Sequence, residues 1–238
     1  MEERIVVTGG RPLNGSVKIP AAKNSVLPLF AASLLCTGEV RLQAVPRLAD
    51  VEHCMALLRG VGCSARWEGG DAVLPGPPAN STLPGQTAGQ MRASILFCAP
   101  LLARLGRAET SLPGGCRIGA RPIDLHLYAL KRLGASFFEA GGMILARADR
   151  LRGARIRFSY PSVGATENAI LAAVTAEGET EIENCAREPE IMELCRFLAA
   201  MGARIRGAGK SRIAVEGVRR LYPAEFFLGG DRICAGTY

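Results

Sequence analysis

The sequence predicts an α/β fold assembled from repeated helix and strand units. Apolar segments of helical length, each ending at a glycine, alternate with short runs of β-branched residues that favour strands. The same order of segments recurs at a spacing of about 70 residues, which indicates an internal repeat. The 238 residues are 48% hydrophobic, which is enough apolar surface for the core of one large domain or two small ones.

The first helix of each unit is predicted at a strongly apolar segment. These segments cover residues 24–38, 91–106 and 165–178. Each ends at a glycine that suits the position just after a helix, where the backbone turns into the left-handed region: Gly38, Gly106 and Gly178. We therefore expect three equivalent helices that stop at these glycines.

The second helix of each unit is predicted at residues 50–62, 122–134 and 189–202, and the terminal glycines are Gly62, Gly134 and Gly202. In the first of these helices Val51, Met55 and Leu58 share one face, as expected for a helix that covers a sheet. Asp50 fits an N-cap, and Pro122 and Pro189 fit the first turn of their helices.

Short strands are predicted between the helices. The clearest runs lie at residues 39–45, 143–148, 180–185 and 212–218, where β-branched and polar residues alternate. Residues 217–238 are expected to be a connector followed by the opening of a further unit. The pattern therefore predicts sheets covered by amphipathic helices.

The net charge of +7 and the pI near 9.2 favour an anionic ligand. A nucleic acid is disfavoured because the basic residues are scattered and few aromatic residues could stack on bases. No leader-like segment or membrane-length apolar run is present, so we expect a cytoplasmic protein that does not bind membranes. The eight cysteines form no CxxC pair and should be reduced, mostly as small core residues, and no spacing indicates a metal site.

Residues 111–126, SLPGGCRIGARPIDLH, combine a cysteine with a glycine-rich loop. The glycines allow backbone conformations that are closed to other residues, so the loop can expose Cys116. Arg117 and Arg121 lie near it in sequence, and nearby cations lower the pKa of a thiol. Cys116 is therefore a candidate to react or to transfer a proton, the alternative being an ordinary surface turn.

A candidate anion site is predicted at the start of each first helix. Lys23 with Asn24, Arg92, and the turn of Ser162, Val163 and Gly164 occupy equivalent places in the repeat. Because helix N-termini present free amides and partial positive charge, added basic residues there favour bound anions. The alternative is that Lys23 and Arg92 are solvated surface charges.

The string LPGGCRIGARPIDLHLYALKRLGA, which begins at Leu112, resembles the catalytic loop of the UDP-N-acetylglucosamine 1-carboxyvinyltransferases, a group of the enolpyruvyl transferase family. Three further stretches are similar to that group: AAKNSVLPLFAASLL from Ala21, MRASILFCAPLLARLG from Met91 and PSVGATENAILAA from Pro161. The resemblance extends from about residue 4 to Tyr238.

The resemblance implies an inside-out α/β barrel, or α-β prism, of three repeated βαβαββ-type units around a pseudo-threefold axis. Residues 1–21 would form an N-terminal strand that crosses to a second domain, residues 22–228 the domain with the cysteine loop, and residues 229–238 the start of the truncated second domain. The missing C-terminal domain would complete the site, so we expect this chain to be a fragment without activity alone.

The implied reaction is transfer of the enolpyruvyl group of phosphoenolpyruvate to the 3′-hydroxyl of UDP-N-acetylglucosamine, with release of phosphate, in peptidoglycan precursor synthesis. Cys116 would be the general acid toward the methylene carbon and the target of fosfomycin. No metal or organic cofactor is implied.

The resemblance also implies roles for the other candidates. Lys23 and Arg121 would contact the phosphate of phosphoenolpyruvate, Asn24 the sugar, and Arg92 the ligand cleft. The uridine and its diphosphate would be held by Arg121, Pro122, Ile123, Asp124 and Leu125, and by Ser162, Val163 and Gly164. From the residues alone, Asp124 also fits a helix first turn and His126 fits helical packing.

The chain departs from the group at two places. Tyr160 stands where some members carry a lysine near the diphosphate, and Pro20, Ala21 and Ala22 replace a Ser-Gly-Ala lead into the Lys-Asn pair. Two alternatives remain open. The shikimate-pathway enolpyruvyl transferases are similar but have a Lys-Ser pair and no cysteine loop, and a non-catalytic sugar-nucleotide-binding remnant would keep only the binding site.

Overall fold

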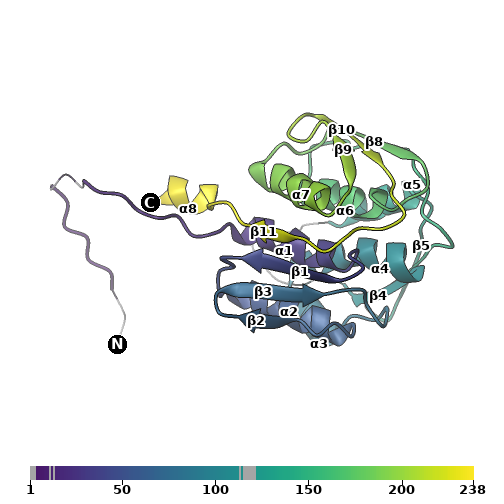
Figure 1. Ribbon diagram of the computed structural model, residues 1–238, viewed down its shortest axis with the longest axis horizontal. Coiled ribbons are helices and arrows are strands. Elements are labelled where there is room, and N and C mark those ends of the chain that lie inside the picture. The colour runs from purple at the N-terminus through teal and green to yellow at the C-terminus, as the bar shows by residue number, and fades with distance from the viewer. Residues whose placement is uncertain (1–3, 11, 13, 113, 115–121) are drawn as a thin grey trace.

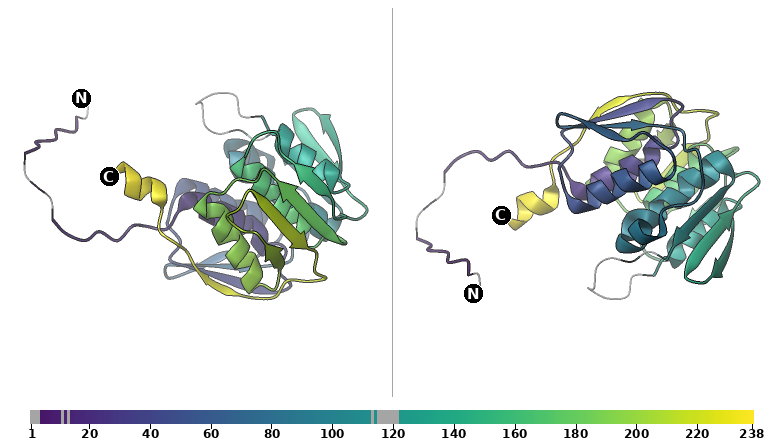
Figure 2. Two further views of the ribbon diagram at one scale, coloured as in Figure 1. Left: turned by 90° about the horizontal axis from the view of Figure 1, so that it is seen from above. Right: turned by 90° about the horizontal axis from the view of Figure 1, so that it is seen from below.

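A computed structural model describes residues 4–10, 12, 14–112, 114 and 122–238 (Figure 1). Its helices and strands alternate along the chain and form mixed sheets, which confirms the predicted α/β class. The strands bury one face and expose the other, whereas the central helices are buried on all sides. The sheets therefore lie outside and the helices inside (Figure 2).

The first helices of the repeat form the centre of the fold. They are α1 (Lys23–Ser33), the 3-10 helix η1 (Arg92–Phe97) that continues into α4 (Cys98–Leu105), and α6 (Val163–Ala173). Every residue from Ser25 to Ser33 in α1 and from Ala165 to Ala173 in α6 is buried. A helix that is apolar on all sides gains most when other elements surround it, which explains the central position.

The second helices pack around this centre: α2 (Ala49–Gly60), α5 (Asp124–Arg132) and α7 (Pro189–Ala200). Each is followed by a glycine with positive φ, as predicted, at Gly62 (90°), Gly134 (103°) and Gly202 (100°). The same pair of hydrogen bonds closes each end, for example from Gly62 N to Arg59 O (3.0 Å) and from Cys63 N to Leu58 O (2.9 Å). Pro189 begins α7, as expected for a first-turn proline.

Three sheets cover the helices. The first has the order β11-β1-β3-β2, the second β4-β6-β5 and the third β7-β8-β10-β9. Their strands are β1 (Glu39–Gln43), β2 (Arg66–Glu68), β3 (Asp71–Pro75), β4 (Arg107–Ser111), β5 (Ser136–Ala140), β6 (Met143–Arg147), β7 (Arg155–Arg157), β8 (Glu179–Glu183), β9 (Arg204–Arg206), β10 (Arg212–Glu216) and β11 (Glu225–Phe227). The four runs predicted as strands are confirmed as β1, β6, β8 and β10.

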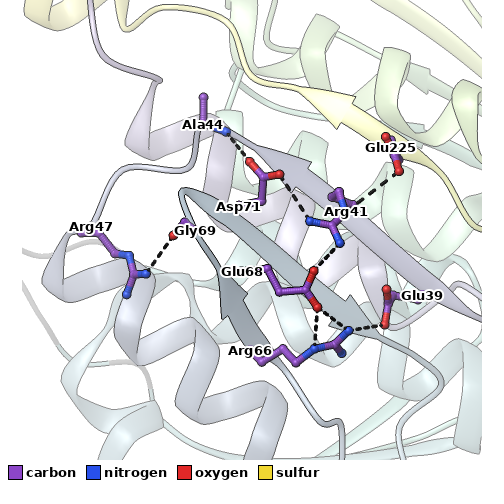
Figure 3. Close-up of polar contacts among 9 residues, drawn as sticks. All are labelled: Glu39, Arg41, Ala44, Arg47, Arg66, Glu68, Gly69, Asp71 and Glu225. Carbon is purple, nitrogen blue, oxygen red and sulfur yellow. Dashed lines mark hydrogen bonds and ion pairs between the residues drawn. The ribbon is translucent and has the colours of Figure 1, made fainter.

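The outer faces of the sheets carry paired charges. On the first sheet Arg41 contacts Glu68, Asp71 and Glu225, and Arg66 contacts Glu68 at 2.7 Å (Figure 3). Because successive side chains of a strand point to opposite faces, the charged residues face solvent while the residues between them enter the core. Such exposed pairs add little stability, so their main effect is to keep the outer face soluble.

Several predicted helix ends are wrong. Gly106 does cap α4 with φ of 70°, but α1 and α6 end at Ser33 and Ala173, before Gly38 and Gly178. Tightened turns follow α1, with Leu35 N bonded to Ala32 O (3.0 Å), and the chain then enters a strand.

Two predicted helix starts are also wrong. Asp50 lies in the first turn of α2, because the N-cap is Leu48, two residues before the predicted cap. Pro122 lies before α5, whose N-cap is Ile123.

The described residues before Ala21 and the short helix at the end of the chain extend from the same side of the fold (Figures 1 and 2). The described residues before Ala21 form no strand, and Ile5, Val6, Val7 and Val17 are more than four-fifths exposed. Ala21 bridges Gly230, just before the short helix α8 (Arg232–Thr237). A further short helix, α3 (Gly85–Gln90), precedes η1. In the described part of the chain no helix is long and apolar enough to cross a membrane.

Candidate functional site

A cavity of about 430 Å³ opens where the N-terminal ends of α1, η1 and α6 converge. Lys23 and Asn24 line it from α1, Arg92 from η1, and Val163 and Gly164 from α6. The first amides of a helix have no partner within the helix and carry partial positive charge. Three such ends, together with a lysine and an arginine, make this cavity suited to an anion.

Lys23 is paired with a carboxylate at the cavity. Its Nζ lies 2.9 Å from Asp50 Oδ2, and both side chains are about two-fifths exposed. Asp50 comes from the first turn of α2 and also lines the cavity. An anion in the cavity would therefore compete with Asp50 for the Lys23 ammonium group.

Arg92 connects the cavity to the segment that precedes α5. Its Nη2 donates a hydrogen bond of 2.8 Å to the carbonyl oxygen of Pro122. Pro122 thus lies beside the predicted anion site, although its own side chain does not line the cavity.

The neighbours of Pro122 take other positions. Ile123 packs against the core, Asp124 begins α5 and Leu125 is buried in the core. The structure does not place these three side chains on the cavity wall. Cys116, Arg117 and Arg121 lie outside the described residues.

Ser162 acts as the N-cap of α6. Its Oγ accepts a hydrogen bond of 3.4 Å from the amide of Ala165, which fixes the turn that presents Val163 and Gly164 to the cavity. Gly164 is needed there because an added Cβ would lie 2.9 Å from Cε1 of His126. The Ser162 oxygen thus accepts a hydrogen bond in the cap, and its O–H group can still donate to a ligand.

His126 is buried beneath Gly164, which agrees with its interpretation as a packing residue, but it also lines the cavity. Its Nδ1 lies 3.2 Å from Nδ2 of Asn168, which also donates to the carbonyl of Ile95 at 3.3 Å. Burial, together with the nearby charge of Arg92, lowers the pKa of His126 to about 4, and Asp124 opposes this only weakly. The imidazole is therefore neutral at physiological pH.

Three further charged residues line the cavity and were not predicted from the sequence: Glu167, Glu190 and Arg232. Glu190 lies in the first turn of α7 and is paired with Arg232 of α8 at 3.2 Å. The spacing of four residues between Val163 and Glu167 could have indicated a shared helix face. No sequence signal indicates the approach of Arg232, because it depends on where the chain places the start of α8 relative to α7.

A family model and the relatives found by sequence comparison all name carboxyvinyltransferases. Residues 7–238 match the family described as EPSP synthase (3-phosphoshikimate 1-carboxyvinyltransferase). The chain is 47% identical over 236 residues to UDP-N-acetylglucosamine 1-carboxyvinyltransferase of Nitratidesulfovibrio vulgaris Hildenborough, covering 99% of the chain and 57% of that protein. The protein of the same name from Nocardia farcinica is 48% identical over 247 residues, covering 100% of the chain and 58% of the relative.

Solved structures agree on the fold. The enolpyruvyl transferase NikO from Streptomyces tendae superposes with a TM-score of 0.81 at 22% identity, over 94% of this chain and 53% of NikO. EPSP synthase from Acinetobacter baumannii gives a TM-score of 0.72 at 18% identity, over 91% of this chain and 50% of that one. The chain thus spans little more than half the length of the proteins it matches.

Proposed function

Because this chain belongs to the EPSP synthase (3-phosphoshikimate 1-carboxyvinyltransferase) family, we propose that it takes part in transfer of the enolpyruvyl group of phosphoenolpyruvate to the 3′-hydroxyl of UDP-N-acetylglucosamine. The observation that carries the proposal is the convergence of Lys23, Asn24 and Arg92 with the α6 N-terminus on one cavity. Both proposed substrates are anionic. Relatives that are 46–48% identical are named for this acceptor.

A second candidate is transfer to 3-phosphoshikimate, which the description of the matching family names. Two features of the sequence oppose it. Lys23 is followed by Asn24 instead of the serine expected for that group, and the loop around Cys116 resembles the transferases specific for the sugar nucleotide.

We assign the candidate residues to the substrates as follows. Lys23 and Arg121 bind the phosphate of phosphoenolpyruvate, Asn24 binds the sugar, and Arg92 lies in the cleft between them. The segment from Arg121 to Leu125, with Ser162, Val163 and Gly164, binds the uridine and diphosphate. The contact between Arg92 and Pro122 supports this assignment because it holds that segment beside the cavity.

The proposed reaction is an addition followed by an elimination. The 3′-hydroxyl oxygen bonds to C2 of phosphoenolpyruvate and gives its proton to a general base, while Cys116 delivers a proton to the methylene carbon. Loss of phosphate from C2 and of a proton from the new methyl group then restores the double bond. The cations around the cavity would stabilise the anionic intermediate, and the reaction needs no metal or organic cofactor.

The proposed domain organisation follows the longer relatives. Residues 22–228 form the domain with the cavity, as an α-β prism of three units about a pseudo-threefold axis. Residues 1–21 and 229–238 belong to the connection with a further domain, which would supply the general base. The exposed apolar residues Ile5, Val6, Val7 and Val17 support this, since such side chains are normally covered by a partner surface.

Calorimetric titration of the chain with UDP-N-acetylglucosamine tests the proposal. We expect binding, and we expect Arg92→Ala to weaken it about tenfold because a charge-assisted contact with the ligand is lost. Lys210→Ala is the matched control, since Lys210 is an exposed cation remote from the cavity. Salt-sensitive binding of short DNA without any response to the sugar nucleotide would contradict the proposal.

The role of Cys116 predicts selective reactivity toward thiol reagents. Six of the seven cysteines that the structure describes are buried. Burial raises the pKa of these thiols, to about 11 for Cys63 and Cys185 and to about 12 for Cys98 and Cys195. At neutral pH we therefore expect iodoacetamide to label Cys116 first, as peptide mapping would show.

The control variants separate Cys116 from Cys234, which is partly exposed. Cys116→Ala should abolish the fast labelling phase, whereas Cys234→Ser should leave it intact. A fast phase that persists in Cys116→Ala would show that the thiol is not activated.

A further inference from the structure

Glu167 is a buried acid on the wall of the cavity. It lies in α6, one helical turn after Val163, and only 5% of its surface is exposed. Among the residues that the structure describes, no hydrogen bond or ion pair involves its carboxyl group. A buried carboxyl group without a partner is unfavourable, so it normally has a specific role or a ligand.

Burial and the charges around Glu167 favour its protonated form. Burial is the main cause that raises its pKa well above the usual range, and the carboxylates of Glu190 and Glu188 raise it further. Glu190 is itself only 3% exposed and is paired with Arg232 through contacts of 3.2 and 3.3 Å. The negative charge next to Glu167 is thus fixed in place.

The charged groups on the other elements around α6 do not lower the pKa of Glu167. Across the cavity, α1 and α2 contribute the paired Lys23 and Asp50. From α5, His126 is neutral because its pKa is lowered to about 4, and from η1, Arg92 donates to Pro122. The raised pKa thus favours a neutral Glu167, whose carboxylic acid is a hydrogen-bond donor, on the wall of a cavity that Lys23 and Arg92 also line.

We propose that Glu167 is a further ligand-binding residue, whose carboxylic acid donates a hydrogen bond to a phosphate or carboxylate oxygen of the ligand in this cavity. The inference rests on the proposed function for the identity of the ligand. A short O–H···O⁻ bond gives the acid a partner and adds to the attraction of the surrounding cations. An ionised Glu167 would instead repel the same ligand.

The proposal predicts how binding depends on pH. Because Glu167 donates only when protonated, affinity for an anion should fall as pH rises through its raised pKa. Binding above that pKa should also be accompanied by proton uptake, which calorimetry in buffers of different ionisation enthalpy measures. Replacement by glutamine keeps a neutral donor at every pH, so it should remove the proton uptake.

The experiment compares Glu167→Gln with Glu167→Ala, using UDP-N-acetylglucosamine, phosphoenolpyruvate and inorganic phosphate as separate probes. At pH 7.5 we expect the alanine variant to bind the anion about tenfold more weakly, and the glutamine variant to recover most of this loss. Glu177→Gln is the control, because Glu177 is an exposed carboxylate that does not line the cavity. It should bind within threefold of the parent, by the usual scatter for surface changes of about 0.5 kcal/mol.

The outcomes distinguish the two proposals. If the sugar nucleotide binds and both Glu167 variants match the parent for all three probes, the inference is wrong while the proposed function stands. If only inorganic phosphate binds, with the expected order of variants, the inference stands for an anion and the proposed function fails. An equal loss in the glutamine and alanine variants would also overturn the inference, provided that thermal unfolding shows both to be folded.

Discussion

Replacement of Gly217 by alanine should lower the free energy of unfolding by about 3 kcal/mol. An added Cβ at Gly217 would lie 1.6 Å from the carbonyl oxygen of Ala176, which belongs to the turn after α6. The obstacle is backbone, so no rotation of a side chain can relieve it. Gly217 N also donates to Gly178 O at 3.0 Å, and the shift needed to make room would strain this bond.

Chemical denaturation of the two proteins measures this difference. Gly70→Ala is the matched control, because nothing lies within 4 Å of the Cβ that it would add. It should change stability by less than about 0.5 kcal/mol. Equal stabilities of Gly217→Ala and the parent would show that the sheet can move away from the helix end more easily than the structure indicates.

The equivalent positions of the other units explain why glycine is needed at Gly217. Gly76 N bonds to Gly38 O (3.1 Å) and Ala148 N bonds to Gly106 O (2.8 Å), so the three positions form the same contact. Alanine is tolerated at Ala148 because α4 ends directly at Gly106, with no additional turn beyond it. After α1 and α6 the chain makes a further turn that occupies the space of a Cβ.

The difference between the end of α4 and the ends of α1 and α6 also shows which features the sequence could predict. The helix starts at Lys23, Arg92 and Val163 were found because polar or basic residues precede long apolar runs, and those positions do converge on one cavity. The glycines after the second helices were placed correctly because a positive φ is a local property of the chain. The ends of the first helices depend on packing against a strand from farther along the chain. Local sequence does not predict this contact.

The same limit applies to the site. Asp50 was interpreted as a cap because acids are common there, but its carboxylate instead pairs with Lys23, 27 residues away. Glu190 and Arg232 are far apart in sequence and meet only because the first residue of α8 lies beside the first turn of α7. Local pattern therefore indicates which groups can bind an anion, whereas the balance of charge around them depends on tertiary contacts.

The stability of the protein should fall by about 3 kcal/mol between pH 7 and pH 4 through the titration of His126 alone. Its pKa is lowered to about 4 in the folded chain, against a usual value of 6.5. Between these values the unfolded chain binds more protons than the folded chain. The contribution of His126 is thus fully present above pH 6.5 and is lost as pH falls toward 4.

Glu167 acts in the opposite direction, so a single pH titration cannot isolate His126. The raised pKa of Glu167 means that the folded chain holds its proton above pH 4.5, and its contribution decreases as pH rises from there. The contribution of Glu167 is the same in the parent and in His126→Asn, so it cancels when the pH dependence of their stabilities is compared. Asparagine keeps an acceptor for Asn168 Nδ2, and it cannot be protonated in this range.

We therefore expect urea denaturation to show a stability loss on acidification that is about 3 kcal/mol smaller for His126→Asn than for the parent. His53→Asn, which removes the other histidine of the chain, should retain the loss seen in the parent.

Parallel curves for the parent and His126→Asn would mean that His126 accepts a proton in the folded state. Since Asn168 directs an N–H group toward its Nδ1, such a proton would require the amide of Asn168 to turn over. The Oδ1 atom of Asn168, which has no hydrogen-bond partner in the described structure, would then accept a hydrogen bond from the protonated Nδ1 of His126.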